Sequence, residues 1–135
     1  MTVGDGHSGE GATRHVWDAD VRRVVHRIHR RFSALTVNTY DCHPFCGPAG
    51  NRQGWSRRSL DVWGAGGRGD ALGHDLSRHV ARFLFNMPGD PLIRHLIVEH
   101  DFWLRGAGWL TWSADDHDGI LRHVHATYLP VPPFA

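Results

Sequence analysis

Two histidines near the end of the chain, His123 and His125, are separated by a single residue. Side chains at positions i and i+2 of a β-strand point to the same side of the sheet. On a strand, both imidazoles therefore face one way, with their backbone positions about 6–7 Å apart. Neutral imidazole is the commonest metal ligand in proteins, so the pair suits a metal ligand with a catalytic neighbour. Two solvent-facing histidines on an edge strand are the alternative that this tripeptide leaves open.

Two further residues have the chemistry of metal ligands. His43 follows a short β-type run, and Asp61 lies in the middle of a second one, where alternation gives it the same face as Ser59 and Trp63. A carboxylate flanked by apolar residues is costly to bury unless it is paired or binds a cation. Together with one histidine of the C-terminal pair, these residues supply two His ligands and one Asp ligand and leave the fourth position open for water. That arrangement is typical of catalytic zinc sites.

The residues in question lie in three runs, 38–44 (NTYDCHP), 59–64 (SLDVWG) and 122–128 (RHVHATY). In this order and composition the runs resemble the hedgehog/DD-peptidase superfamily of zinc enzymes, which includes LAS-type peptidoglycan peptidases and D-Ala-D-Ala carboxypeptidases. The pattern of that family is a His, then an Asp, then a C-terminal His-x-His or Glu-x-x-His. The resemblance covers roughly residues 35–130 and implies the small antiparallel sheet of that family.

The resemblance implies a role for each matching residue. His43, Asp61 and His125 would hold Zn²⁺, and His123 would be the catalytic residue that assists the attacking water or stabilises the transition state. The implied activity is cleavage of peptide bonds in peptidoglycan stem peptides or cross-links. Arg122 occupies the position three residues before His125, where one carboxypeptidase branch has its glutamate, so that branch is disfavoured.

Other parts of the expected site follow from the substrate. An arginine could hold the carboxylate of a wall peptide through a bidentate pair, and the candidates are Arg57 and Arg58, with Trp63 lining the groove. Residues 44–60 separate the first His from the Asp, a longer interval than the family usually has. Cys42 and Cys46 flank His43 and could form a disulfide, remain free thiols or ligate a metal themselves.

The elements that must position these residues are two helices and several short strands. Apolar spacings of three and four predict helices over residues 17–34 and 75–87. Strands are expected over residues 35–40, 59–63, 93–99 and 123–129, with a further hairpin around Gly106 and Gly108. The order of elements predicts an α+β domain with a small, largely antiparallel sheet and two main helices. We expect a disordered, glycine-rich lead-in over residues 1–14 and a single domain over residues 15–135.

Composition narrows the classes of function. The 135 residues carry a net charge of +1 and fifteen basic residues, all arginine, so a mechanism that needs a Schiff-base lysine is excluded. Near-neutral charge argues against a nucleic-acid partner, and no apolar run reaches the roughly 20 residues that span a bilayer. No signal peptide is visible in residues 1–12, which leaves the localisation undetermined. We expect a monomer.

Two other functions compete with a zinc peptidase. A non-catalytic descendant of the same fold would bind a wall peptide or a protein partner and hold zinc only structurally. A His/Asp metallonuclease is the second alternative, since the arginine-rich face of the first helix suits a polyanion. Activity on purified cell wall, compared with nicking of a plasmid, separates the peptidase from the nuclease.

Overall fold

The computed structural model describes residues 17–39, 55–111 and 122–130. These residues form a six-stranded sheet of order β1-β2-β6-β3-β4-β5, in which all neighbouring strands are antiparallel. The strands are β1 (Thr36–Thr39), β2 (Ser59–Trp63), β3 (Ile93–Val98), β4 (Asp101–Leu104), β5 (Gly108–Thr111) and β6 (Val124–Tyr128). The helices are α2 (Ala19–Arg31), the one-turn α3 (Trp55–Arg58) and α4 (His74–Phe85). The predicted α+β class, with two main helices and an antiparallel sheet, is confirmed.

The two main helices form because each has one apolar face. In α2 the buried residues Val21, Val24, Val25 and Ile28 recur at spacings of three and four, and in α4 Val80, Ala81 and Leu84 do the same. Both helices are shorter than predicted from the sequence. Helix α2 ends at Arg31 because the backbone of Phe32 (φ −132°, ψ 68°) leaves the helical region.

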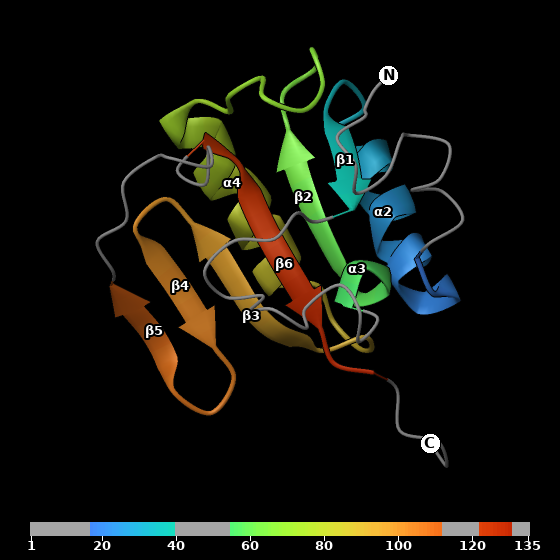
Figure 1. Cartoon of the computed structure of the whole chain (residues 1–135), viewed down its shortest axis with the longest axis vertical. Helices are drawn as coiled ribbons and strands as arrows, with labels where there is room; N and C mark the ends of the chain where they lie inside the picture. Colours follow the sequence, from blue (N-terminus) through green and yellow to red (C-terminus); the bar gives the residue numbers. More distant parts are fainter. Residues whose placement is uncertain (1–16, 40–54, 112–121, 131–135) are drawn as a thin grey trace.

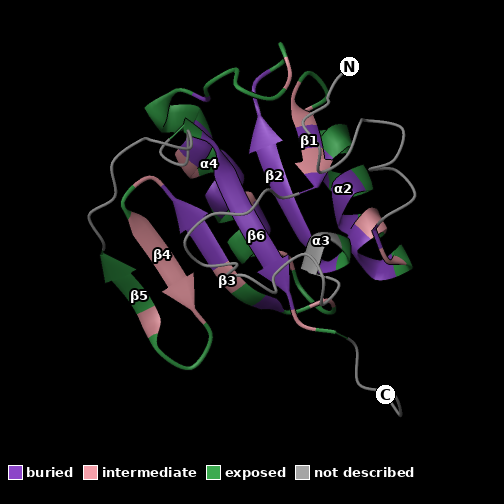
Figure 2. Cartoon of the chain, viewed as in Figure 1, coloured by how far each residue is buried: buried purple, intermediate pink, exposed green. Residues whose placement is uncertain are grey.

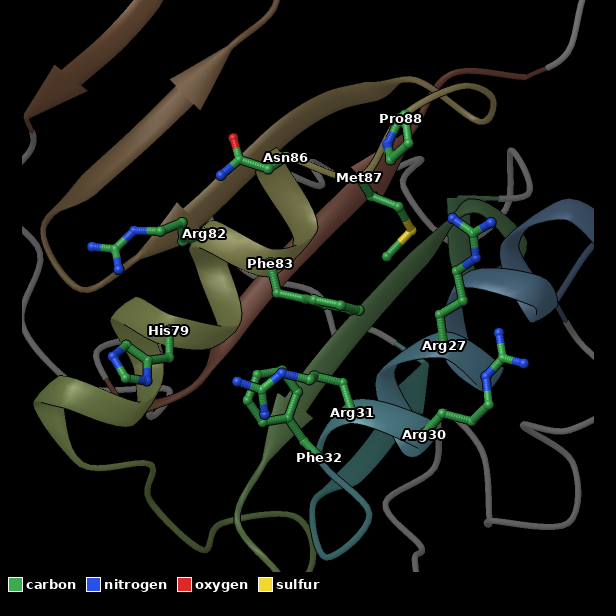
Figure 3. A pocket seen from close by; sticks show the side chains of 10 residues that line it. All are labelled: Arg27, Arg30, Arg31, Phe32, His79, Arg82, Phe83, Asn86, Met87 and Pro88. Carbon is green, nitrogen blue, oxygen red and sulfur yellow. The ribbon is translucent and has the colours of Figure 1, made fainter.

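Both helices lie on one face of the sheet (Figure 1). They meet each other through Phe32 and Phe83, whose ring centroids are 5.5 Å apart in an edge-to-face arrangement (Figure 3). The sheet contributes its apolar side chains to this face, and the core includes Leu60, Val62, Leu96, Val98, Val124, Ala126 and Tyr128.

The opposite face of the central strands is polar. Antiparallel pairing of β2 with β6 sets Ser59 against Thr127 and Asp61 against His125. Because side chains alternate along a strand, these four residues share the face that the two helices do not cover. Every residue of β2 and β6 is nevertheless buried (Figure 2). The polar groups of this face therefore need hydrogen-bond partners inside the protein.

Of the two hairpin turns between β3, β4 and β5, one was predicted from the sequence and one was not. The hairpin expected around Gly106 and Gly108 joins β4 to β5, and both glycines have positive φ. A second hairpin, from β3 to β4, turns at Glu99, which has a φ of 53°. That turn was not predicted because a non-glycine residue at positive φ is uncommon. Strand β3 consequently ends at Val98 rather than at residue 99.

Two further points concern the N-terminal residues and the possibility of a membrane-spanning helix. The predicted disordered lead-in, residues 1–14, lies outside the described residues. Among the described helices, none has both the length and the apolar character needed to cross a bilayer.

Candidate functional site

Asp61 is at the centre of the buried polar face. It is the middle residue of β2, where it pairs with His125 of β6 on one side and Asn38 of β1 on the other. Its side chain is 2% exposed. A carboxylate buried to this extent stays ionised only if nearby groups compensate its charge, so its neighbours decide its state.

Two imidazoles supply that compensation. His125 Nδ1 lies 2.8 Å from Asp61 Oδ1, and His123 Nε2 lies 3.4 Å from the same oxygen. The prediction that both histidines face one way is therefore confirmed, although β6 begins at Val124 and His123 precedes it. Burial alone would raise the pKa of the Asp61 carboxyl, but His123 and then His125 outweigh burial and hold that pKa well below its usual range.

The Trp63 ring positions His123. The two rings are stacked with their centroids 4.2 Å apart and their planes 20° from parallel. Strand alternation predicted that Trp63 shares the face of Asp61, and this contact confirms it. Because the indole covers one side of the imidazole, His123 has little freedom to rotate about its own bonds.

The far side of His125 is held by residues that the sequence did not single out. His125 Nε2 is 2.8 Å from Thr127 Oγ1 and 3.1 Å from His95 Nε2, and Thr127 Oγ1 is 2.7 Å from Ser59 Oγ. Thr127 could have been found, since it follows His125 at i+2 on the same strand. His95 could not, because it comes from β3, whose pairing with β6 shifts register between Ile93 and His95.

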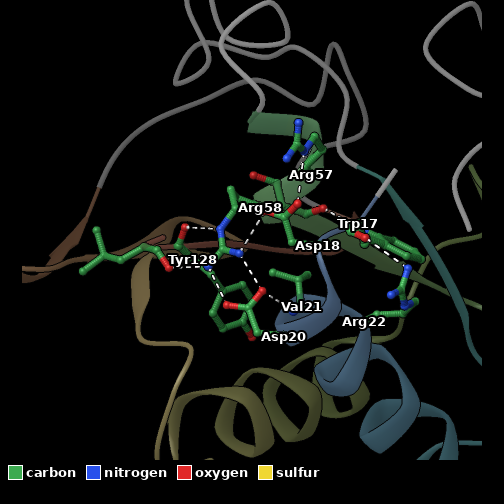
Figure 4. A network of polar contacts seen from close by, with 10 residues as sticks. Trp17, Asp18, Asp20, Val21, Arg22, Arg57, Arg58 and Tyr128 are labelled. Atoms are coloured by element: carbon green, nitrogen blue, oxygen red, sulfur yellow. Dashed lines mark hydrogen bonds and ion pairs between the residues drawn. The ribbon is translucent and has the colours of Figure 1, made fainter. Parts of the chain in front are cut away.

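The predicted substrate-binding arginines have other partners in the structure. Arg58 is buried, and its guanidinium makes a bidentate pair with Asp20, at 2.6 and 2.9 Å (Figure 4). It also bonds Asp18 at 3.2 Å and the carbonyl oxygen of Leu129. The guanidinium of Arg58 is therefore bound by Asp20 and Asp18 on the helix side of the sheet, opposite Asp61. This corrects the expectation that Arg58 binds a substrate carboxylate. The neighbouring Arg57 is exposed and pairs with Asp18 at 3.1 Å.

The remaining predicted site residues are His43 and the two cysteines that flank it. His43, Cys42 and Cys46 lie outside the described residues. Across the described segments, no group of three or more His, Cys, Asp or Glu side chains is arranged to hold a metal ion. Those segments thus contribute two of the three expected ligands, Asp61 and His125.

Asp61 Oδ1 and His125 Nδ1 are atom types that zinc binds, but they lie at hydrogen-bond distance from each other and would have to move apart slightly to share an ion. Two ligands on a tetrahedral zinc are roughly 3.3 Å apart, given metal–ligand distances near 2.0–2.1 Å, and Asp61 Oδ1 and His125 Nδ1 are 2.8 Å apart without an ion. Two acceptor atoms at that separation require a proton or a cation between them. The neutral tautomer of His125 that leaves Nδ1 free carries its proton on Nε2, where Thr127 Oγ1 accepts it.

Comparison with known proteins adds no name to this arrangement: no protein-family model matches the chain, and no match was found among curated proteins or solved structures.

Proposed function

We propose that this protein is a zinc-dependent peptidase that cleaves peptide bonds of peptidoglycan stem peptides or cross-links. The observation that carries the proposal is the convergence of His123 and His125 on Oδ1 of the buried Asp61. His43, Asp61 and His125 would hold the metal. The substrate class rests on the resemblance of three sequence runs to the hedgehog/DD-peptidase superfamily.

When bound, zinc would polarise the peptide carbonyl and lower the pKa of water to about 7. The chain's own residues would transfer the proton, hold the catalytic ring in place and bind the substrate carboxylate. His123 Nε2, 3.4 Å from the ligand oxygen of Asp61, is close enough to the metal position to hold or transfer a proton beside the reacting carbonyl. Trp63 keeps that ring in place. Arg57 is the expected arginine that remains for a substrate carboxylate, since exposed ion pairs such as its pair with Asp18 are weak.

A second candidate is a structural zinc site on a non-catalytic binding module. It is favoured by burial: Asp61 is 2%, His125 1% and His123 5% exposed. Structural zinc sites are closed and have four protein ligands, and His123 would then be the fourth ligand rather than a catalytic group. A substrate could reach His123 only if this face of the sheet opened.

The proposal is tested by bound metal and by wall hydrolysis, measured on the same preparations. We expect about one zinc per chain in the wild type, and its loss in His43→Ala, Asp61→Ala and His125→Ala. His79→Ala is the matched control, because His79 is exposed on α4 and should leave the zinc content unchanged. The wild type should release peptides from purified peptidoglycan and should not nick plasmid DNA.

The outcomes separate the candidates. A wild type without zinc, even after zinc is supplied, would remove the enzyme proposal. Zinc without peptide release would favour the structural site. Zinc with plasmid nicking would favour the nuclease. Retention of zinc in His43→Ala alone would show that the first ligand had been assigned to the wrong histidine.

Thr127→Val is expected to weaken zinc binding about 10- to 100-fold, because His125 loses the acceptor that holds its Nε2 proton and orients its ring. The measurement is the zinc dissociation constant from competition with a chromophoric chelator. Thr111→Val makes the same chemical change at an exposed position of β5, the far edge strand of the sheet, and should have no effect. Unchanged affinity in Thr127→Val would mean that His95 alone orients the ligand.

A further inference from the structure

A groove lies on the outer side of the two helices, away from the polar face of the sheet (Figure 3). It runs between α2 and α4 and has a volume of about 840 Å³, which is within the range of ligand-binding pockets. The proposed peptidase uses no residue of this groove.

The rim of the groove is cationic. Arg27, Arg30 and Arg31 enter it from α2 and Arg82 from α4, and all four are exposed. No acidic side chain is among the residues that line it, and within the described segments none of the four arginines has an ion-pair partner. The whole chain has a net charge of only +1. The positive charge is thus a local feature that selects an anionic ligand.

The floor of the groove is apolar. Phe32, Phe83 and Met87 line it and are half-buried. The Arg31 guanidinium lies 4.6 Å from the centre of the Phe32 ring, and Phe83 meets the same ring edge to face. A ligand that fills the groove must therefore bring apolar groups to the floor as well as negative charge to the rim.

We propose that this groove binds an acidic, amphipathic helix of a partner protein. Two helices that leave an apolar strip between them offer the surface into which a third helix packs. Along α4 the groove runs from His79 to Asn86, the residue that follows the helix, a length of about 10 Å. The partner segment would thus contact it over about two turns, with apolar residues at i, i+3, i+4 and i+7 and carboxylates on both sides.

Two other anionic partners match the groove less well. A bilayer surface is flat on this scale, whereas the apolar side chains Phe32 and Phe83 are recessed and half-buried. Single-stranded nucleic acid needs open aromatic faces on which bases stack, but the ring of Phe32 is contacted by both Arg31 and Phe83.

The test is fluorescence anisotropy of a labelled synthetic peptide of about four helical turns, with leucine along one stripe and glutamate on both flanks. We expect the full chain to bind it, and Arg30→Gln combined with Arg82→Gln to weaken binding about tenfold. Arg23→Gln is the matched single-charge control, because Arg23 is exposed on α2 but does not line the groove. It should change binding less than either groove variant alone.

Altered peptides, lipid vesicles and an oligonucleotide test whether the groove prefers an acidic helix to other anionic ligands. Replacing the glutamates by glutamine, or the leucines by glutamine, should each abolish measurable binding to the wild type. The proposal is overturned if the Leu/Glu peptide does not bind, or if it binds equally well to the Arg30→Gln, Arg82→Gln double variant. It is also overturned if phosphatidylglycerol vesicles or a single-stranded oligonucleotide bind more tightly than the peptide and lose affinity in that variant.

Discussion

Replacement of His123 by alanine is expected to slow peptide hydrolysis by about 10²- to 10⁴-fold, the usual contribution of a positioned acid–base group. The zinc content should stay at that of the wild type, because the proposed ligands His43, Asp61 and His125 remain. The physical reason is the position of His123 Nε2, which faces Oδ1 of Asp61, the proposed ligand oxygen, at 3.4 Å and is held there by Trp63. The measurements are the rate of peptide release from purified peptidoglycan and the metal content of the same sample.

The His123→Ala variant also separates the two zinc sites that the geometry allows. Loss of zinc together with activity would identify His123 as a fourth ligand of a closed, structural site. Unchanged activity with unchanged zinc would show that the ring has no part in the reaction. His29→Ala, an exposed histidine on α2, controls for the removal of an imidazole and should alter neither quantity.

The geometry around Asp61 shows what alternation along a strand can predict. Ser59, Asp61 and Trp63 were expected on one face, and His123 and His125 on one face, because the side-chain period of a strand is two. The contacts among Asp61, Trp63 and the two histidines bear this out. Alternation does not predict which strands are neighbours. It is the pairing of β2 with β6 in the structure that brings Asp61 and Trp63 next to the two histidines.

The same rule explains the error at Arg58. This residue directly precedes Ser59, so it points to the opposite side from Asp61, and a shift of one residue changes the face of a side chain. Its partner, Asp20, lies in the first turn of α2 and was not singled out in the sequence as a site residue. It is a buried carboxylate, 8% exposed, that receives the guanidinium. No local sequence pattern links two residues that are 38 positions apart. The ion pair between Asp20 and Arg58 therefore could not be predicted from the sequence.

Arg58→Met is accordingly expected to lower the free energy of unfolding by about 3–5 kcal/mol, because it leaves the Asp20 carboxylate buried without its partner. The free energy is measured by urea denaturation at neutral pH. Arg57→Met is the matched control on the same one-turn helix, and its exposed pair with Asp18 should contribute about 0–1 kcal/mol. In the double variant Asp20→Asn, Arg58→Met the loss should be smaller than in Arg58→Met alone, since no charge is left buried.

The pH dependence of this difference gives the last check. Burial raises the pKa of Asp20, but its bonds and charge interaction with Arg58 outweigh burial and lower the pKa below its usual value. A carboxyl whose pKa is lower in the folded state than in the unfolded chain stabilises the fold above the unfolded value, about 3.9, and this contribution is lost as the pH falls through the folded pKa. In Arg58→Met burial alone acts on the Asp20 carboxyl and raises its pKa. The advantage of the wild type should therefore begin to shrink above about pH 4, as the unpartnered carboxyl of the variant takes up a proton, and continue to shrink until the pH falls through the lowered pKa of Asp20 in the wild type. An advantage that stays constant from pH 7 to pH 3 would mean that the pair contributes through packing of the arginine side chain and not through its charge.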